Sequence, residues 1–167
     1  LGGDLEISSG IHPLSEEIIE KISESGQLSQ TVKFHTMVSS EDKGSIFTDI
    51  RAIDKYYPLY GSIQSNPKGS SQTLFLGSSN PSILINENIQ KQFELEVGDN
   101  ITILNKKFTV QGIILSVPNL DGAMIFGEFA LISKSEFEKF NLTSAGSFLD
   151  YDYHLKIKNN ENTQPQI

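Results

Sequence analysis

The sequence predicts a mixed fold of strands and short helices, with more sheet than helix. Twenty Ile and only four Ala favour strands, because β-branched side chains suit a pleated sheet whereas Ala is the strongest helix former. Apolar residues alternate with polar ones in several short segments, and helical spacing occurs only in brief stretches between them. At 167 residues the chain is long enough for one domain, or for two small lobes that share an interface.

A short strand and a helix open the chain. Alternating apolar and polar residues predict a strand over 4–8 that ends at Gly10. We expect a helix over 13–25, because Pro13 suits a first helical turn and Gly26 suits the position after the last one. The apolar residues at helical spacing in this segment are Leu14, Ile18, Ile19 and Ile22.

An antiparallel hairpin and a tyrosine-rich segment follow. The alternating segments 32–38 and 46–53 are separated by the charged turn 41–44, a pattern typical of a hairpin. Three of the five Tyr residues then surround a proline within 56–61. We place a boundary between two lobes at this segment.

The next segment is polar, and a strand and a short helix come after it. Ser, Asn, Gly and Pro are frequent in 62–82, which predicts a mobile loop with a small apolar anchor at 74–76. A strand over 83–85 leads to Asn86, which we expect to cap a short helix that ends at Phe93.

Turn and cap signals predict the elements that follow. Gly98 and Asp99 lie in a tight turn that feeds a compact β-unit over 101–115. Ser133 and Glu136 have the spacing of a capping box, so a second short helix should begin there.

A closing strand is predicted over 151–158 from its alternating residues. Asp150 and Asp152 would share one face of this strand and could bind a cation. We favour the simpler interpretation, a solvated strand edge that discourages pairing with another chain.

Charge and composition exclude several classes of function. With a net charge of −8 and Arg51 as the only arginine, the chain is a poor partner for nucleic acid, because phosphate binding needs clustered cations. No stretch approaches the roughly 18 apolar residues that span a bilayer. Without cysteine there is no disulfide, no thiolate zinc site and no cysteine nucleophile.

Motifs for catalysis are missing from the sequence. Neither the phosphate-binding Gly-x-x-x-x-Gly-Lys-Ser/Thr nor the nucleophile elbow Gly-x-Ser-x-Gly occurs. His12, His35 and His154 are widely separated, so we expect them on loops or on the sheet surface rather than around a metal ion. We therefore predict no catalytic, cofactor-binding or metal-binding residues.

The tyrosine-rich segment is the best candidate for contact with a partner. Tyr combines a large apolar face with a hydroxyl, so it is frequent both at binding surfaces and in half-buried packing positions. We favour packing between lobes here, and we favour the core over an exposed loop for Met124, Phe126 and Phe129. The candidate residues for an interface or a structural motif are Tyr56, Tyr57, Pro58, Tyr60, Gly61, Gly98 and Asp99.

Several short motifs occur in a characteristic order. They are Leu1-Gly2-Gly3-Asp4-Leu5, Arg51-Ala52-Ile53-Asp54, Tyr57-Pro58-Leu59-Tyr60-Gly61, Leu95-Glu96-Val97-Gly98-Asp99-Asn100-Ile101, and Gly146-Ser147 ahead of Tyr151-Asp152-Tyr153. This order resembles the extracytoplasmic domain of MacB/FtsX-type ABC transporter permeases, and is most similar to the YbbP-like, lysophospholipase-associated branch. The resemblance covers nearly the whole chain and depends on order, because each motif is a turn or strand signature.

The resemblance implies an α+β fold, the MacB-like periplasmic core, in which a membrane-proximal β-α-β lobe carries an inserted, mainly β lobe. We assign 1–58 and 142–167 to the membrane-proximal lobe and 59–141 to the inserted lobe. A membrane span is expected just before Leu1. In the family the first lobe continues with more helix and strand, so we expect it to be incomplete in this chain.

The resemblance also implies a non-catalytic domain outside the inner, cytoplasmic membrane, without a cofactor. It would couple ATP hydrolysis by a separate cytoplasmic ATPase subunit to the handling of a substrate or partner. The implied partners are that subunit, reached through the transmembrane part of the permease, a second permease copy, and a periplasmic protein or lipid-linked substrate. Two alternatives stay open: a free-standing extracytoplasmic binding or adhesion module, and a small hydrolase.

Overall fold

The computed structural model describes residues 4–118, 120, 127–142 and 149–158. Within these residues, the strands are β1 (Leu5–Gly10), β2 (Gly26–Ser40), β3 (Gly44–Ile53), β4 (Gln64–Asn66), β5 (Ser82–Asn86), β6 (Asn100–Ile103), β7 (Lys106–Ser116), β8 (Phe129–Ser133) and β9 (Asp150–Ile157). The helices are α1 (Glu16–Ser23), α2 (Glu87–Phe93), α4 (Lys134–Glu138) and the 3-10 helix η1 (Ser70–Phe75).

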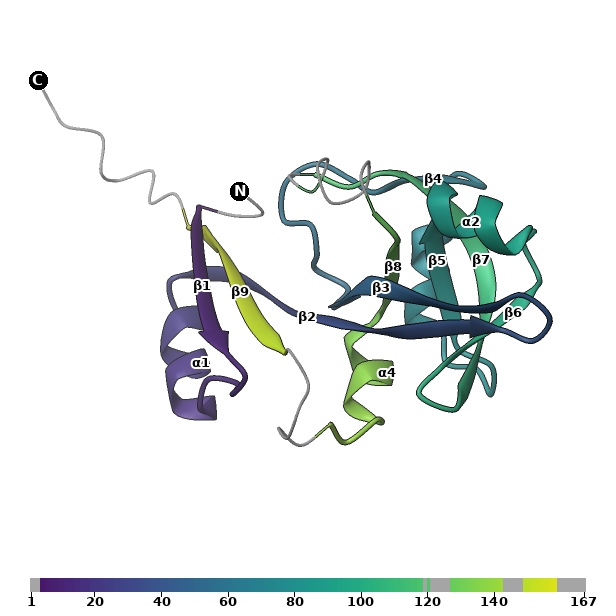
Figure 1. Ribbon diagram of the computed structural model, residues 1–167. Helices are drawn as coiled ribbons and strands as arrows, with labels where there is room; N and C mark the ends of the chain where they lie inside the picture. The colour runs from purple at the N-terminus through teal and green to yellow at the C-terminus, as the bar shows by residue number, and fades with distance from the viewer. Residues whose placement is uncertain (1–3, 119, 121–126, 143–148, 159–167) are drawn as a thin grey trace, which may run out of the picture.

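All these strands belong to one mixed sheet (Figure 1). The order in the sheet is β1-β9-β2-β3-β8-β5-β7-β4, and β6 pairs with both β2 and β7. Most neighbours are antiparallel, whereas β3 with β8 and β5 with β7 are parallel. The predicted α+β class with a dominant sheet is confirmed.

The first helix is shorter than predicted. It begins after Ser15, whose Oγ accepts a hydrogen bond from the backbone N of Ile18 at 3.4 Å, and Pro13 lies outside it. Gly26 does not follow the helix as a cap but begins β2. A Cβ at Gly26 would lie 1.9 Å from the carbonyl oxygen of Lys156, so glycine is needed for the close approach of β2 and β9.

The predicted hairpin is confirmed as β2 and β3, and β2 extends beyond it. Residues 32–40 of β2 form the ladder with β3. Residues 26–33 pair with β9, and Val38 at the far end pairs with β6. Figure 1 shows β2 running from β1 and β9 across the molecule to the hairpin end beside β6. One strand therefore pairs with β9 in its first half and with β3 and β6 in its second half.

The segment 62–82 is not the open loop that its composition predicts. It contains β4, which pairs with β7, and η1, which packs against β5 and β7. Leu74 is the apolar anchor and is buried, whereas Leu76 is exposed. Polar side chains make contacts within the segment: the Oγ of Ser70 donates to the Oγ of Ser65 at 2.8 Å.

The elements from β5 to α4 agree with the prediction. The side chain of Asn86 accepts a hydrogen bond from the backbone N of Ile89 at 3.3 Å and caps α2. Ser133 caps α4 in the same way, with the backbone N of Glu136 as the donor at 3.2 Å. The β-unit after Gly98 is formed by β6 and β7.

The closing strand lies inside the sheet. The predicted strand is present as β9, but it pairs with β1 on one side and β2 on the other. The expectation of a solvated edge at Asp150 and Asp152 is therefore wrong. Asp152 is buried, and a carboxylate oxygen of Asp150 accepts a hydrogen bond from the Oγ of Ser8 at 2.5 Å.

Apolar residues pack on both faces of the sheet. Successive strand residues point to opposite faces; accordingly Ile83 belongs to a large apolar cluster and Leu84 to a smaller one. Phe129 is fully buried in the smaller cluster, as predicted. Met124 and Phe126 lie outside the described residues.

The predicted division into lobes, with 1–58 and 142–167 in one and 59–141 in the other, stays a prediction. The sheet crosses this division, since β3 pairs with β8 and β2 pairs with β6. Within the described ranges, no helix has both the length and the apolar character needed to cross a membrane.

Candidate functional site

The segment 56–61, here called the tyrosine turn, leaves the sheet just after β3. Asp54 fixes its start. The Oδ1 atom of Asp54 accepts hydrogen bonds from the Oγ of Ser29 at 2.9 Å and the backbone N of Tyr56 at 3.1 Å. Its Oδ2 atom accepts one from the backbone N of Gln30 at 2.7 Å. These bonds hold the start of the turn against β2.

Tyr57 lies over β9 and is half-buried. Its ring centre is 5.5 Å from that of the His154 imidazole, and its side chain packs against the smaller apolar cluster. Burial raises the pKa of Tyr57 to about 12, although Arg51 acts to lower it. The hydroxyl therefore stays protonated at neutral pH.

The other two tyrosines of the turn are more exposed. The hydroxyl of Tyr60 lies 3.0 Å from both carboxylate oxygens of Asp4, to which it donates, and the Nζ of Lys156 lies 4.8 Å from its ring centre. The ring of Tyr56 faces the Nζ of Lys55 at 5.2 Å. Tyr57 and Tyr60 thus connect the turn to the β1–β9 end of the sheet, and a role in partner contact stays a prediction.

A buried polar layer lies beneath the turn. His154 is 7% exposed, so the expectation that it lies on the surface is wrong. Its Nε2 atom is 3.3 Å from the Oγ1 of Thr31, and its Nδ1 atom is buried without a hydrogen-bond partner among the described residues. Burial lowers the pKa of His154. Burial, and then the charge of Asp150, raise the pKa of the neighbouring Asp152 carboxyl.

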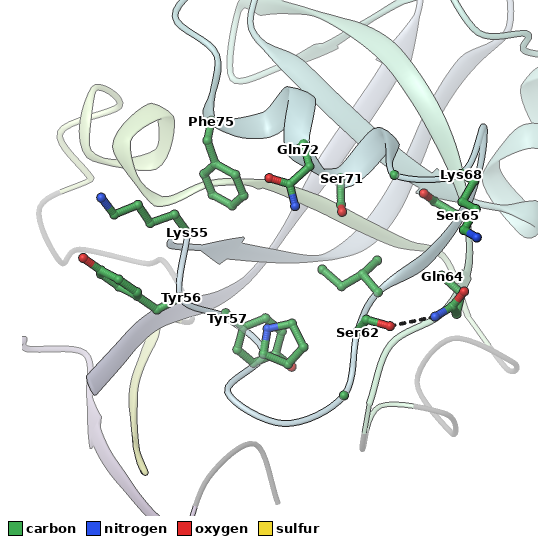
Figure 2. Close-up of a pocket in the computed structure, with 14 residues that line it drawn as sticks. Lys55, Tyr56, Tyr57, Ser62, Gln64, Ser65, Lys68, Ser71, Gln72 and Phe75 are labelled. Atoms are coloured by element: carbon green, nitrogen blue, oxygen red, sulfur yellow. Dashed lines mark hydrogen bonds between the residues drawn. The ribbon is translucent and has the colours of Figure 1, made fainter. Parts of the chain in front are cut away.

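A cleft of about 390 Å³ opens beside the tyrosine turn (Figure 2). Three segments supply its lining: 55–58, 61–65 and 68–75. The first belongs to the turn, the second leads into β4, and the third contains η1. In Figure 2, Gln72 of η1 and Tyr57 of the turn lie on opposite sides of the cleft.

The lining of the cleft combines aromatic, polar and cationic side chains. Its aromatic and polar members are Tyr56, Tyr57, Phe75, Ser62, Gln64, Ser65, Ser71 and Gln72. The Nε2 atom of Gln64 donates to the Oγ of Ser62 at 2.7 Å, which fixes part of one wall (Figure 2). Lys55 and Lys68 lie at opposite ends of the cleft, and no Asp or Glu is among the described residues that line it.

Pro58 and Gly61 place the turn at the rim of the cleft. Gly61 has a φ of 75°, a conformation that favours glycine. A Cβ at this position would also meet the Cγ of Pro118 at 3.0 Å. The predicted motif of Tyr57, Pro58 and Gly61 is thus part of the cleft wall.

The predicted turn at Gly98 and Asp99 is confirmed, and it lies outside the lining of the cleft. Gly98 has a φ of 102° and donates its backbone N–H to the carbonyl oxygen of Val110 at 2.8 Å. The Oδ2 of Asp99 accepts a hydrogen bond from the backbone N of Glu96 at 2.8 Å. Both residues stabilise the entry into β6.

The other two histidines are on the surface, as expected. His12 is exposed, and His35 stacks on Phe47 with ring centres 5.5 Å apart. No group of three His, Asp or Glu side chains that could hold a metal ion occurs in the part of the chain that the structure describes.

The sequence indicates one wall of the cleft, the tyrosine turn, but not the wall formed by η1 and β4. The tyrosine turn was a candidate, but η1 and β4 fall in 62–82, which was expected to be a loop. The available signal was the apolar anchor at Leu74, which indicates that this polar segment packs against the core. Lys68 and Gln72 precede that anchor in the sequence and lie in the lining.

Comparison with known proteins gives matches to structures but not to sequences. No protein-family profile matches the chain, and no curated protein matches it in sequence. The extracellular domain of the ABC-type transporter YknZ from Gram-positive bacteria is similar in structure, with a TM-score of 0.60 and 8% identity. That match covers 89% of this chain and 75% of the YknZ chain.

Two further structures agree with this match. The periplasmic region of MacB from Actinobacillus actinomycetemcomitans has a TM-score of 0.56 at 12% identity, over 91% of this chain and 69% of that one. A domain of a protein named as a permease, from Porphyromonas gingivalis, has a TM-score of 0.54 at 15% identity. That match covers 90% of this chain and 69% of the other. This chain therefore has the α+β fold of the extracellular and periplasmic domains of MacB- and YknZ-type ABC transporter permeases.

Proposed function

We propose that this chain is the extracytoplasmic domain of an ABC transporter permease and that the domain itself is non-catalytic. The observation that carries the proposal is the fold, which matches domains of MacB and YknZ over about nine tenths of the chain. The similarity of the ordered sequence motifs to the YbbP-like branch makes that branch our finer assignment.

The position of the first and last strands, β1 and β9, supports this role. Leu5 of β1 pairs with Leu155 of β9, and the backbone N of Ile157 donates to the carboxylate of Asp4 at 2.9 Å. The chain therefore enters and leaves the described fold at one place. This arrangement suits a domain that is inserted between two membrane spans, with the β1–β9 end next to the membrane.

The proposed activity is mechanical coupling. A separate cytoplasmic ATPase subunit would hydrolyse ATP, and the transmembrane part of the permease would move the β1–β9 end of this domain. β2 pairs with β9 near one of its ends and with β6 near the other, which supports our proposal that it carries a displacement between them. A second permease copy and a periplasmic protein or lipid-linked substrate are the partners that we propose outside the membrane.

A single-cysteine accessibility experiment tests the location. Lys91 on α2 has a side chain that is 76% exposed, so Lys91→Cys in an otherwise cysteine-free full-length protein should be accessible from the side on which the domain lies. We expect a membrane-impermeant maleimide to label it in intact spheroplasts. The matched control is Ile85→Cys, which is fully buried and should react only after denaturation. Labelling of Lys91→Cys only after lysis would contradict the proposal.

Hydrogen exchange on the assembled transporter tests the coupling. We expect amide exchange in β1 and β9 to change when ATP is turned over, because these strands would lie next to the moving membrane part. A transporter with a hydrolysis-deficient ATPase subunit is the control and should show no change. Identical exchange with and without turnover in the active transporter would exclude coupling through this end of the sheet.

The cleft beside the tyrosine turn supports a second candidate, a free-standing extracytoplasmic binding module. The two candidates differ in gene structure, because a permease requires apolar runs of about 20 residues on both sides of this segment. A complete reading frame without such runs would leave the binding module as the better explanation.

A further inference from the structure

We infer that the cleft beside the tyrosine turn is a binding site for a small anionic sugar, a mono- or disaccharide that carries a carboxylate or a phosphate. The inference goes beyond the proposed function, because it concerns a ligand and holds for a permease domain and a free-standing module alike. The volume of about 390 Å³ lies in the range of small-molecule sites, roughly 300–1,000 Å³.

The charge of the lining is opposite to that of the protein. The chain carries 21 Asp and Glu against 13 Lys and Arg. The cleft nevertheless contains Lys55 and Lys68 and, among its described lining residues, no carboxylate. The carboxylate of Asp54, next to this wall, accepts hydrogen bonds from Ser29, Tyr56 and Gln30 and is held toward β2. A lysine at each end of the cleft therefore favours an anion there, and no carboxylate among the described lining residues opposes it.

The polar side chains of the cleft suit hydroxyl groups. A sugar hydroxyl both donates and accepts hydrogen bonds, and the side chains of Ser and Gln do the same. Gln72 and Ser71 come from η1, whereas Ser62 and Gln64 come from the opposite segment and are already bonded to each other. In Figure 2 these two pairs lie on different walls, so a ring between them can be contacted along both edges.

The aromatic side chains supply apolar faces for the C–H side of a sugar ring. Tyr57 and Phe75 lie on opposite sides of the cleft, and Tyr56 lies at its rim beside Lys55 (Figure 2). A Tyr also offers a hydroxyl, so it contacts both the apolar and the polar parts of an amphipathic ligand. This mixture of ring faces, hydroxyls, amides and ammonium groups fits an acidic sugar better than a purely apolar molecule or a bare inorganic anion.

The walls of the cleft are held in place before any ligand binds. β4 pairs with β7, and the Ser70–Ser65 hydrogen bond joins η1 to β4. Leu74 anchors η1 in the smaller apolar cluster, and Asp54 holds the turn on the other side. A site with fixed walls loses less free energy to ordering when it binds a ligand.

NMR titration of the ¹⁵N-labelled chain tests the inference with defined probes. D-Glucuronate and D-glucose 6-phosphate are the carboxylate and phosphate arms, D-glucose is the uncharged comparison, and acetate and inorganic phosphate are anions without a ring. We expect saturable shifts of amides in 55–58, 61–65 and 68–75 with at least one charged sugar. The affinity of that charged sugar should be at least tenfold higher than the affinity of glucose or of the simple anion. Whichever of the two charged sugars binds more tightly identifies the preferred anionic group, carboxylate or phosphate.

Surface variants separate binding from folding. Lys68→Gln should weaken binding of the charged sugar about five- to tenfold, because a charge-assisted contact is lost, and Gln72→Ala should weaken it by a smaller factor. Both side chains are exposed, so the fold should be unchanged. The matched control is Lys91→Gln on α2, outside the lining, which should bind like the wild type.

Three results would overturn the inference. They are equal affinity for glucose and the charged sugars, equal affinity for a simple anion and the corresponding sugar, and shifts that are absent or lie outside the three lining segments. The titration uses the chain in solution and the maleimide experiment uses membranes, so failure of this inference is distinguishable from failure of the proposed function.

Discussion

The buried imidazole of His154 makes stability depend on pH. Burial lowers its pKa from the usual 6.5 and outweighs the carboxylates of Glu6, Asp152 and Asp54, which act to raise it. The unfolded chain therefore binds a proton that the folded chain does not, and the free energy of unfolding falls as the pH drops below about 6.5. Burial, and then Asp150, raise the pKa of the Asp152 carboxyl, so its protonation acts in the opposite direction as the pH falls.

Urea unfolding at pH 7.5 and pH 5.5 measures this dependence. We expect the wild type to lose stability between the two values and His154→Gln to lose clearly less. The control is His35→Gln, which makes the same change of residue type at an exposed position. An unchanged dependence in His154→Gln would mean that another group titrates in this range.

The backbone conformation at position 98 favours glycine over any other residue. Its φ of 102° is strained for a β-branched side chain, although no heavy atom lies within 4 Å of a Cβ placed there. We expect Gly98→Val to lower the free energy of unfolding by about 1–3 kcal/mol, because the strain is conformational rather than steric. Gly77→Val is the control at an exposed glycine without a positive φ, and a melt unchanged by Gly98→Val would contradict the assignment.

Single residues show where sequence reasoning succeeds. The Gly98 turn is a local property and could be predicted from three residues. Gly26 also follows a helical pattern, but its role is set by the backbone of Lys156, which is distant in sequence. The burial of His154 likewise depends on Tyr57 and on the place of β9 inside the sheet. Neither contact leaves a signal near the residue concerned.

At the scale of elements, an ion-pair group attaches α4 to β7. Glu136 is 8% exposed and accepts hydrogen bonds from Lys106 of β7 and from Lys139. Burial acts to raise the pKa of Glu136, but the two ammonium groups outweigh it, and the pKa lies below its usual 4.5. The stability that this group contributes is therefore present above pH 4.5 and is lost as the pH falls.

Removing Lys106 tests this attachment. We expect Lys106→Met to lower the free energy of unfolding at pH 7 by about 1–2 kcal/mol, because a mostly buried carboxylate loses one of its two cations. Lys134→Met, on α4 itself, is the matched control. It breaks the pair with the exposed Glu138 and should cost at most about 0.5 kcal/mol. Equal effects of the two substitutions in chemical denaturation would contradict the assignment.

The helices α2 and α4, which begin at a capping residue, are predicted correctly from the sequence. Asn86 and Ser133 cap α2 and α4 as expected, because a cap is formed by residues three positions apart. The start of α1 was placed too early, since Pro13 and Ser15 both suit a helix start and only the bond to Ile18 decides between them. β4 and η1 were missed because polar composition does not reveal a partner strand.

At the scale of the whole molecule, the strand order could not be predicted from the sequence. The alternation of residues predicts that β3 is a strand, and Phe129 is expected in the core, but neither observation reveals that β3 and β8 are parallel neighbours. The same holds for the place of β9 between β1 and β2. Such pairings depend on complementary apolar faces that form only when distant segments meet. The resemblance to a known family predicts the α+β architecture. The cleft between η1 and the tyrosine turn could not be predicted and is seen only in the structure.

The described fold should unfold as one cooperative unit, because β2 pairs with strands on both sides of the predicted division into lobes. Its partners are β3 and β9 in one predicted lobe and β6 in the other. Ile50→Ala removes a fully buried side chain from the larger cluster and should cost about 2–5 kcal/mol. In one cooperative unit, this loss lowers the opening free energy of slowly exchanging amides in β9 as much as in β7, which native-state hydrogen exchange measures. A loss confined to β2, β3 and β9, which lie in the predicted lobe that contains Ile50, would show that the two predicted lobes unfold separately.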